Sequence, residues 1–159
     1  MKRFTLLSLA FIMLLSFAAC GAVTYRNDVA TADIASAVDA KLSGAATLVV
    51  ADELYLTSFN PEYTALVSEY TIKYTSSGAS FDEYGIFKVE NAADTEKIVA
   101  MINEFKQYRI DADLGYLPTE LPKIKDAKTV TYGNYVMYAF LSEDEAVAAF
   151  AELENALTK

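Results

Sequence analysis

The sequence contains no histidine, no tryptophan and a single cysteine, Cys20. Histidine is the commonest general base near neutral pH and the commonest transition-metal ligand in proteins. Its absence excludes serine–histidine and cysteine–histidine catalysis and typical zinc sites. Carboxylate, lysine, tyrosine or serine–lysine chemistry remains, but the sequence has no Ser-x-x-Lys motif. We therefore predict no catalytic residue, no metal site and no cofactor.

Basic residues are also scarce. The chain has 13 lysines and arginines against 22 acidic residues, a formal net charge of −9. Loss of Lys2 and Arg3 with a cleaved leader would leave 11 basic residues and a net charge of −11. A surface this acidic repels phosphate backbones, so we expect no nucleic-acid partner. It also repels anionic lipid headgroups.

The longest uncharged stretch stands at the N-terminus. Lys2 and Arg3 are followed by an apolar segment over residues 4–17 and then by Ala18-Ala19-Cys20-Gly21. A basic start, a short apolar region and small residues before a cleavage point are typical of a secretory signal. The ending resembles the lipobox of bacterial lipoproteins, in which cleavage precedes a cysteine that carries a diacylglyceryl thioether. Phe17 departs from the aliphatic residue usual in that pattern.

Three other interpretations of this segment are possible. The small residues Ser16 and Ala18 could direct a plain secretory cleavage. The segment could stay as an uncleaved anchor, although its apolar run is short for a bilayer core of about 30 Å. It could also be a buried helix of a cytoplasmic protein, which the basic start disfavours. A lone exported thiol has no internal disulfide partner, and this favours lipidation of Cys20.

The predicted organisation follows from this cleavage point. Residues 1–19 form the signal peptide, residues 20–30 form a lipid-anchored tether, and residues 31–159 form one domain of ordinary size. We expect the protein at the cell membrane, on the extracytoplasmic face, held there by the lipid on Cys20.

Periodicity in the first half of the domain predicts a helix and two strands. Ile34, Val38 and Leu42 recur at four-residue steps in a helix that starts near Thr31 and ends before Gly44. Residues 45–63 are ambiguous, since residues 47–50 fit a short strand or a helix continuation. Alternation predicts strands over residues 69–75 and 84–89. A helix with a broad apolar stripe follows, from about residue 94 to residue 109.

The second half repeats this order. Residues 111–126 are loop-like, and strands are predicted over residues 129–132 and 135–141, joined by a two-residue turn at Gly133-Asn134. Ser142 and Glu145 form a capping box before a closing helix whose stripe contains Val147, Phe150 and Leu153. Two strand–strand–helix units after an N-terminal helix predict an α+β fold. We expect a four-stranded, mainly antiparallel sheet with its helices on one face.

Several of these features occur together in a known family. The lipobox, the strand Glu83-Tyr84-Gly85-Ile86-Phe87-Lys88-Val89 before a long helix, and Gly133-Asn134-Tyr135-Val136 before an acidic closing helix resemble one group of proteins. These are small lipoproteins of anaerobic Gram-positive bacteria that carry the domain of unknown function 4358. The resemblance implies location and fold, and it carries over no catalytic residue.

Tyrosine is abundant, with 11 residues in the chain, and several fall on predicted strands. Tyrosine has an apolar body and a polar tip, which suits binding surfaces. If one sheet face is open, the candidate binding residues are Tyr70, Tyr84, Tyr132 and Tyr135. If helices cover that face, the same residues belong to the core.

The sequence therefore predicts a membrane-anchored lipoprotein domain that binds rather than catalyses. Its partner would be another envelope protein, a wall polymer or a small ligand. The alternative is an envelope hydrolase or lyase that works through paired carboxylates. A cleft that joins two of Asp52, Asp82, Asp111 and Asp113 and raises a pKa would favour this alternative.

Overall fold

The computed structural model describes residues 23–158. The predicted signal peptide and Cys20 lie outside the described residues. No helix within residues 23–158 is long and apolar enough to cross a membrane.

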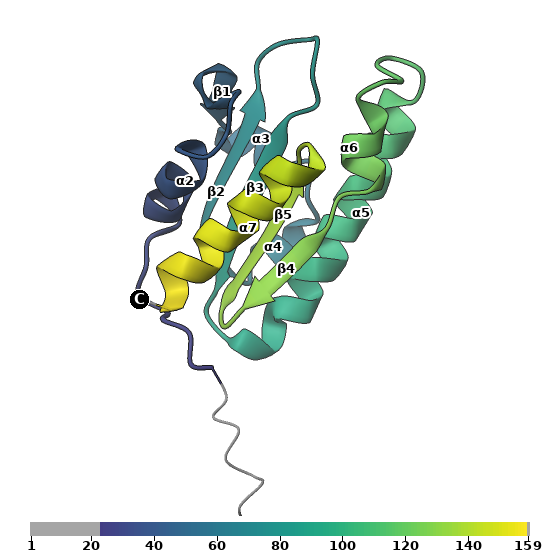
Figure 1. Cartoon of the computed structure of the whole chain (residues 1–159). Helices are drawn as coiled ribbons and strands as arrows, with labels where there is room; N and C mark the ends of the chain where they lie inside the picture. The colour runs from purple at the N-terminus through teal and green to yellow at the C-terminus, as the bar shows by residue number, and fades with distance from the viewer. Residues whose placement is uncertain (1–22, 159) are drawn as a thin grey trace, which may run out of the picture.

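Five antiparallel strands form one sheet in the order β1-β2-β3-β5-β4 (Figure 1). They are β1 (Leu48–Val50), β2 (Val67–Thr75), β3 (Glu83–Val89), β4 (Thr129–Tyr132) and β5 (Tyr135–Phe140). The predicted α+β class and antiparallel pairing are confirmed, but the predicted number of four strands is wrong. The ambiguous segment over residues 47–50 supplies the fifth strand, which pairs with β2 at one edge.

The β4–β5 hairpin forms as its sequence predicts. Tyr132 pairs with Tyr135 across the two-residue turn, and Gly133 has a φ of +57°. That angle is in the left-handed region that glycine adopts without a steric cost. The Asn134 side-chain amide donates to the carbonyl of Val89 at 3.0 Å, which ties the turn to the end of β3.

Six α-helices connect and cover the strands within the described chain. They are α2 (Thr31–Asp39), α3 (Glu53–Leu56), α4 (Pro61–Thr64), α5 (Thr95–Asp113), α6 (Leu121–Lys125) and α7 (Glu143–Thr158). The short 3₁₀ turns η2 (Ala45–Thr47) and η3 (Ala92–Asp94) precede β1 and α5.

The helices cover both faces of the sheet, so the predicted single covered face is wrong. Helices α2 and α7 pack on one face, and α5 packs on the other together with α3, α4 and α6 (Figure 1). Each face has its own apolar core, one around Ile34, Tyr84 and Leu153 and the other around Phe87, Ile102 and Tyr138. Central strands β3 and β5 are therefore buried on both sides.

Helix α5 is longer than its apolar stripe suggests. It continues through Asp111 and Asp113, which the sequence analysis places in a loop. The Gln107 amide donates to Asp111 at 3.0 Å and the Arg109 guanidinium donates to Asp113 at 2.8 Å, both across one helical turn. Such pairs one turn apart stabilise a helix end, so these carboxylates belong to the last turns of α5.

Part of the expected tether packs on the domain. The Tyr25 ring lies 5.2 Å from the Tyr132 ring, and Tyr25 and Val29 contact the core that α2 and α7 cover. The Tyr135 hydroxyl donates to the carbonyl of Val29 at 2.6 Å. The chain therefore joins the domain at the end of the sheet that holds the β4–β5 turn.

Candidate functional site

A buried carboxylate marks the opposite end of the sheet. Glu83 is the first residue of β3, and strand alternation turns it toward the same face as Phe87, under α5. Its side chain is 1% exposed. The Tyr138 hydroxyl donates to one carboxylate oxygen at 2.5 Å and the Tyr55 hydroxyl donates to the other at 2.6 Å. Arg109 completes the shell with an ion pair.

Gly85 allows this arrangement. It pairs with Tyr138 across β3 and β5, and the Tyr138 ring lies directly over it. A Cβ atom at position 85 would lie 2.3 Å from a ring carbon of Tyr138, which is closer than atoms can approach. The missing side chain at Gly85 therefore provides the space through which Tyr138 reaches Glu83.

Arg109 is the second central residue, and it comes from the last turns of α5. Its Nε donates to Asp113 at 2.8 Å, and its Nη1 donates to the Tyr55 hydroxyl at 3.1 Å and to Glu83. The guanidinium also lies 5.8 Å from the centre of the Phe81 ring, within the range of a cation–π contact. The other terminal nitrogen, Nη2, makes no hydrogen bond within residues 23–158.

The electrostatics of this cluster follow from its burial. Loss of water raises the pKa of Glu83, and the neighbouring Arg109 guanidinium opposes that shift. Burial also raises the pKa of both phenols, Tyr55 and Tyr138, with the Glu83 carboxylate acting in the same direction. For Arg109, burial acts to lower the pKa, but Glu83 and Asp113 raise it above its usual value. Arg109 therefore stays charged.

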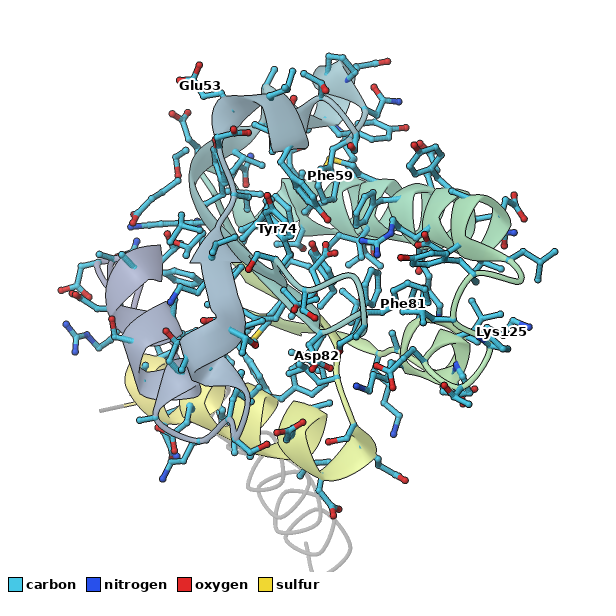
Figure 2. All side chains as sticks on the ribbon, turned by 90° about the horizontal axis from the view of Figure 1, so that it is seen from above. Glu53, Phe59, Tyr74, Phe81, Asp82 and Lys125 are labelled. Atoms are coloured by element: carbon cyan, nitrogen blue, oxygen red, sulfur yellow. The ribbon has the colours of Figure 1, made fainter. Side chains whose placement is uncertain are left out.

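A small polar pocket of about 290 Å³ opens beside this cluster. This volume is at the lower end of the range for small-molecule sites, about 300–1,000 Å³. Figure 2 looks onto this end of the molecule and shows Tyr74, Phe81 and Asp82 near its centre, between α5 and α7. The lining residues come from α3 and the turn after it, from the end of β2, the β2–β3 connection and the start of β3, and from the second half of α5. They are Tyr55, Ser58, Tyr74, Thr75, Ser80, Phe81, Asp82, Glu83, Phe105, Tyr108, Arg109 and Asp113.

Aromatic side chains form one part of this wall. The Tyr55 and Tyr74 rings stack with their centroids 4.6 Å apart and their planes 12° apart. The Tyr108 ring is 58% exposed. The pocket therefore combines an accessible aromatic ring with converging polar groups, which is the composition of a ligand site.

A second ion-pair cluster borders the pocket. Lys123 of α6 donates to Asp82 and to Glu120, each at 2.7 Å. The Ser80 hydroxyl donates to Glu120 at 3.1 Å. These contacts attach the β2–β3 connection to α6 and hold Asp82 at the pocket wall.

A larger groove of about 580 Å³ lies between α6 and the start of α7. Apolar residues such as Ala139, Leu141 and Phe150 line it, and its acidic residues Asp126 and Glu143 are exposed. Within the described chain, it has no cluster of buried polar groups like the one around Glu83. We therefore place the candidate functional site in the polar pocket.

The four tyrosines predicted to bind do not form one surface. Tyr84 and Tyr135 are fully buried, and the Tyr84 hydroxyl donates to Asp39 of α2 at 2.7 Å. Tyr132 is half-buried against the same core, whereas Tyr70 packs on the other sheet face near Phe87. Their positions match the alternative interpretation, in which helices cover the strands and the tyrosines belong to the core.

None of the four tyrosines predicted to bind lines this pocket. The predicted binding tyrosines all lie on strands, whereas the pocket tyrosines Tyr55 and Tyr108 lie on helices. Glu83 could have been found, because counting back by twos from Val89 and Phe87 places it on the buried face of its strand. The position of Arg109 opposite Glu83 depends on tertiary packing, and no local pattern indicates it.

Two of the four aspartates considered for carboxylate catalysis, Asp82 and Asp113, do line this pocket. Each of them already pairs with a cation, Lys123 and Arg109 respectively. Asp52 instead caps α3, accepting a hydrogen bond from the backbone N–H of Tyr55 at 3.0 Å. Among residues 23–158, no group of three or more His, Cys, Asp or Glu side chains could hold a metal ion.

Comparison with protein-family models places part of this chain in a family. Residues 63–141 match a family described as a domain of unknown function (DUF4358), and this region includes β2, β3, α5 and both strands of the β4–β5 hairpin. Neither the curated proteins nor the solved structures contain a match to this chain.

Proposed function

The chain belongs to the DUF4358 family, and from its own residues we propose that it is a lipid-anchored, non-catalytic binding module of the cell envelope. The lipid would be attached to Cys20, on the extracytoplasmic side of the cell membrane. The polar pocket between α3, the β2–β3 connection and α5 would be its ligand site.

One observation carries the binding role. Arg109 lines the pocket and has an Nη2 group without a hydrogen-bond partner in the described chain. None of the buried side-chain nitrogens or oxygens among residues 23–158 lacks a partner, so Nη2 is accessible to solvent. The protein holds the remaining guanidinium nitrogens rigidly, which leaves one preorganised edge for a ligand.

The same geometry disfavours catalysis by paired carboxylates. Glu83 is the pocket carboxylate whose pKa is raised, yet its two oxygens already accept from Tyr55, Tyr138 and Arg109. A general acid or base must come within hydrogen-bond reach of the substrate. The nearly complete burial of Glu83 prevents that contact.

The anchor has a direct test. Mass spectrometry of the purified membrane form should find a lipid-modified Cys20 as the N-terminal residue, and the Cys20→Ala precursor should carry no lipid. An unmodified mature N-terminus at another residue would contradict lipidation.

The ligand site can be tested by NMR on the full-length protein in a polyoxyethylene detergent. We expect components of a cell-wall digest to shift amide signals of residues 55–58, 74–83 and 108–113. The Tyr108→Ala variant should lose these shifts. Leu114→Ala is the matched control, since Leu114 is exposed at the end of the same helix and does not line the pocket.

The NMR titration distinguishes three cases: ligand binding, catalysis, and the absence of a ligand site in this pocket. If no component shifts these amides, the pocket is not a ligand site. If a component is cleaved during the titration, and Asp113→Asn abolishes cleavage, the carboxylate enzyme replaces the binding module.

A further inference from the structure

The residues that line the pocket include both donors and acceptors that make no hydrogen bond within residues 23–158. Arg109 offers an Nη2 donor, whereas Asp82 and Asp113 each use one carboxylate oxygen for a cation and keep the other oxygen unbonded within residues 23–158. The hydroxyl groups of Ser58, Tyr74 and Tyr108 make no hydrogen bond in the same range. Side chains that carry donors, acceptors or hydroxyl groups therefore line one small volume, and a hydroxyl group can both donate and accept.

Each charged side chain of the pocket already has an ion-pair partner of opposite charge. Arg109 has two carboxylates against it, Glu83 and Asp113, and Asp82 pairs with Lys123. An anionic ligand on Nη2 would bring a third negative charge to one guanidinium. A cationic ligand at Asp82 or Asp113 would approach a cation that is already there. Both arrangements cost free energy, because like charges repel.

A neutral, hydroxyl-rich ligand avoids these costs. Its hydroxyl groups can accept from Arg109 and donate to the unbonded oxygen of Asp113. A saccharide ring also has an apolar C–H face, which suits the exposed Tyr108 ring. The volume of about 290 Å³ limits the occupant to a small molecule or one unit of a polymer.

We propose that this pocket binds a neutral sugar residue. The proposal rests on the binding function proposed above and specifies the class of ligand. It commits to a single pyranose unit, free or within a wall glycan, that is recognised by Arg109, Asp113 and the Tyr108 ring.

Four probes that share a pyranose ring test this class. Glucose and N-acetylglucosamine are neutral, glucosamine is cationic at mildly acidic pH, and glucuronate is anionic. We expect the two neutral sugars to bind the full-length protein about tenfold more tightly than the charged ones, measured by NMR titration in the same polyoxyethylene detergent. The neutral affinities should not change with salt, because no ionic contact is involved.

Two variants sharpen the result. Tyr108→Ala should weaken both neutral sugars about tenfold, as expected for one important contact residue, whereas Leu114→Ala should leave them unchanged. Asp113→Asn removes one of the two carboxylates on Arg109, and it should improve glucuronate binding relative to glucose. This shift in preference would not result from a merely structural role of Asp113.

The possible failures are distinct. Equal or tighter binding of glucosamine or glucuronate in the wild-type protein would overturn the neutral-sugar proposal and keep the binding module. Other digest components could shift the same amide signals while none of the four probes binds. This result would also overturn the neutral-sugar proposal and keep the binding module. An absence of any response at these amides would overturn both proposals.

Discussion

At the scale of single residues, burial of Glu83 has the largest energetic consequence. A buried carboxylate without partners would be strongly destabilising, and three donors from Tyr55, Tyr138 and Arg109 compensate for the lost water. Three separate elements, α3, β5 and α5, supply these donors. The carboxylate therefore fixes the relative positions of the elements that form the pocket.

Replacing Arg109 should show how strongly the stability of the fold depends on the partners of Glu83. We expect Arg109→Met to lower the free energy of unfolding by about 3–5 kcal/mol, because Glu83 would remain buried without its ion-pair partner. Adding Glu83→Gln to this variant should recover part of the loss. Urea denaturation measures both effects.

The exposed pair of Lys97 and Asp94 gives the control, and Lys97→Met should cost less than about 0.5 kcal/mol. If Arg109→Met costs no more than this control, Glu83 is not an effectively buried charge.

The pH dependence of stability follows from the raised pKa of Glu83. The folded state binds this proton more tightly than the unfolded state, so the contribution of Glu83 is fully present below the ordinary glutamate pKa. It is lost as the pH rises through the raised value. The lowered pKa values of Glu120 and Glu145 act in the opposite direction, adding stability above the ordinary pKa and losing it in acid.

Comparison with Glu83→Gln isolates the Glu83 contribution. The difference in unfolding free energy, wild type minus variant, should decrease as the pH rises from about 4. Urea titrations at several pH values measure it. A difference that increases with pH would mean that Arg109 outweighs burial and lowers the pKa of Glu83.

At the scale of elements, the apolar side chains of the closing helix α7 divide into two groups. Some are buried in the core, and others line the groove beside α6. Periodicity predicts one apolar stripe that contains Val147, Phe150 and Leu153. In the structure, Val147 is 60% exposed and lines the apolar groove beside α6. Leu153 is fully buried, and Phe150 lies at the boundary between groove and core. The inner edge of the stripe therefore supplies most of the stabilisation.

Truncation along α7 should follow this order. We expect Leu153→Ala to cost about 2–5 kcal/mol and Phe150→Ala about 3 kcal/mol, whereas Val147→Ala should cost less than about 0.5 kcal/mol. The measurement is the urea midpoint of each full-length variant. Similar costs at Val147 and Leu153 would show that the groove is closed in solution.

Local patterns in the sequence predict most elements but not their layering. Three elements have local causes in the sequence: the Gly133-Asn134 turn, the alternating residues of β2 and the apolar stripe of α5. Their predicted positions are therefore correct to within a few residues. The continuous apolar run over residues 135–141 indicates a strand buried on both faces. A strand of this kind needs a helical layer on each face of the sheet, so the predicted single layer conflicts with this run.

The candidate site was harder to predict than the fold. Glu83 and Arg109 are 26 residues apart, and Tyr55 is 54 residues from Arg109. These residues meet only because the last turns of α5 reach the end of the sheet where β3 begins. No spacing rule connects them, and a carboxylate beside Asp82 resembles an ordinary solvated loop residue until the strand boundary is known.

At the scale of the whole molecule, the docked N-terminal segment around Tyr25 and the pocket lie at opposite ends of the described chain. Tyr25 contacts Tyr132 beside the β4–β5 turn, whereas residues where β2 ends and β3 begins line the pocket. Figure 1 shows the β4–β5 turn and the β2–β3 connection at opposite ends of the sheet. Only residues 21–24 separate Cys20 from the docked Tyr25. If Cys20 carries the lipid, this short connection keeps the β4–β5 turn near the bilayer and directs the pocket away from it.

Site-specific labelling can test this orientation, because a lipidated Cys20 leaves no native thiol to react. Fluorophores would be attached to Asn91→Cys, which is exposed near the turn, and to Ser77→Cys, which is exposed in the β2–β3 connection. In vesicles that contain spin-labelled lipids, we expect strong quenching at position 91 and little at position 77. The two labels should respond equally to a water-soluble quencher in detergent, which controls for accessibility. Equal quenching by the spin-labelled lipids would mean that the domain lies on its side, with the pocket close to the membrane surface.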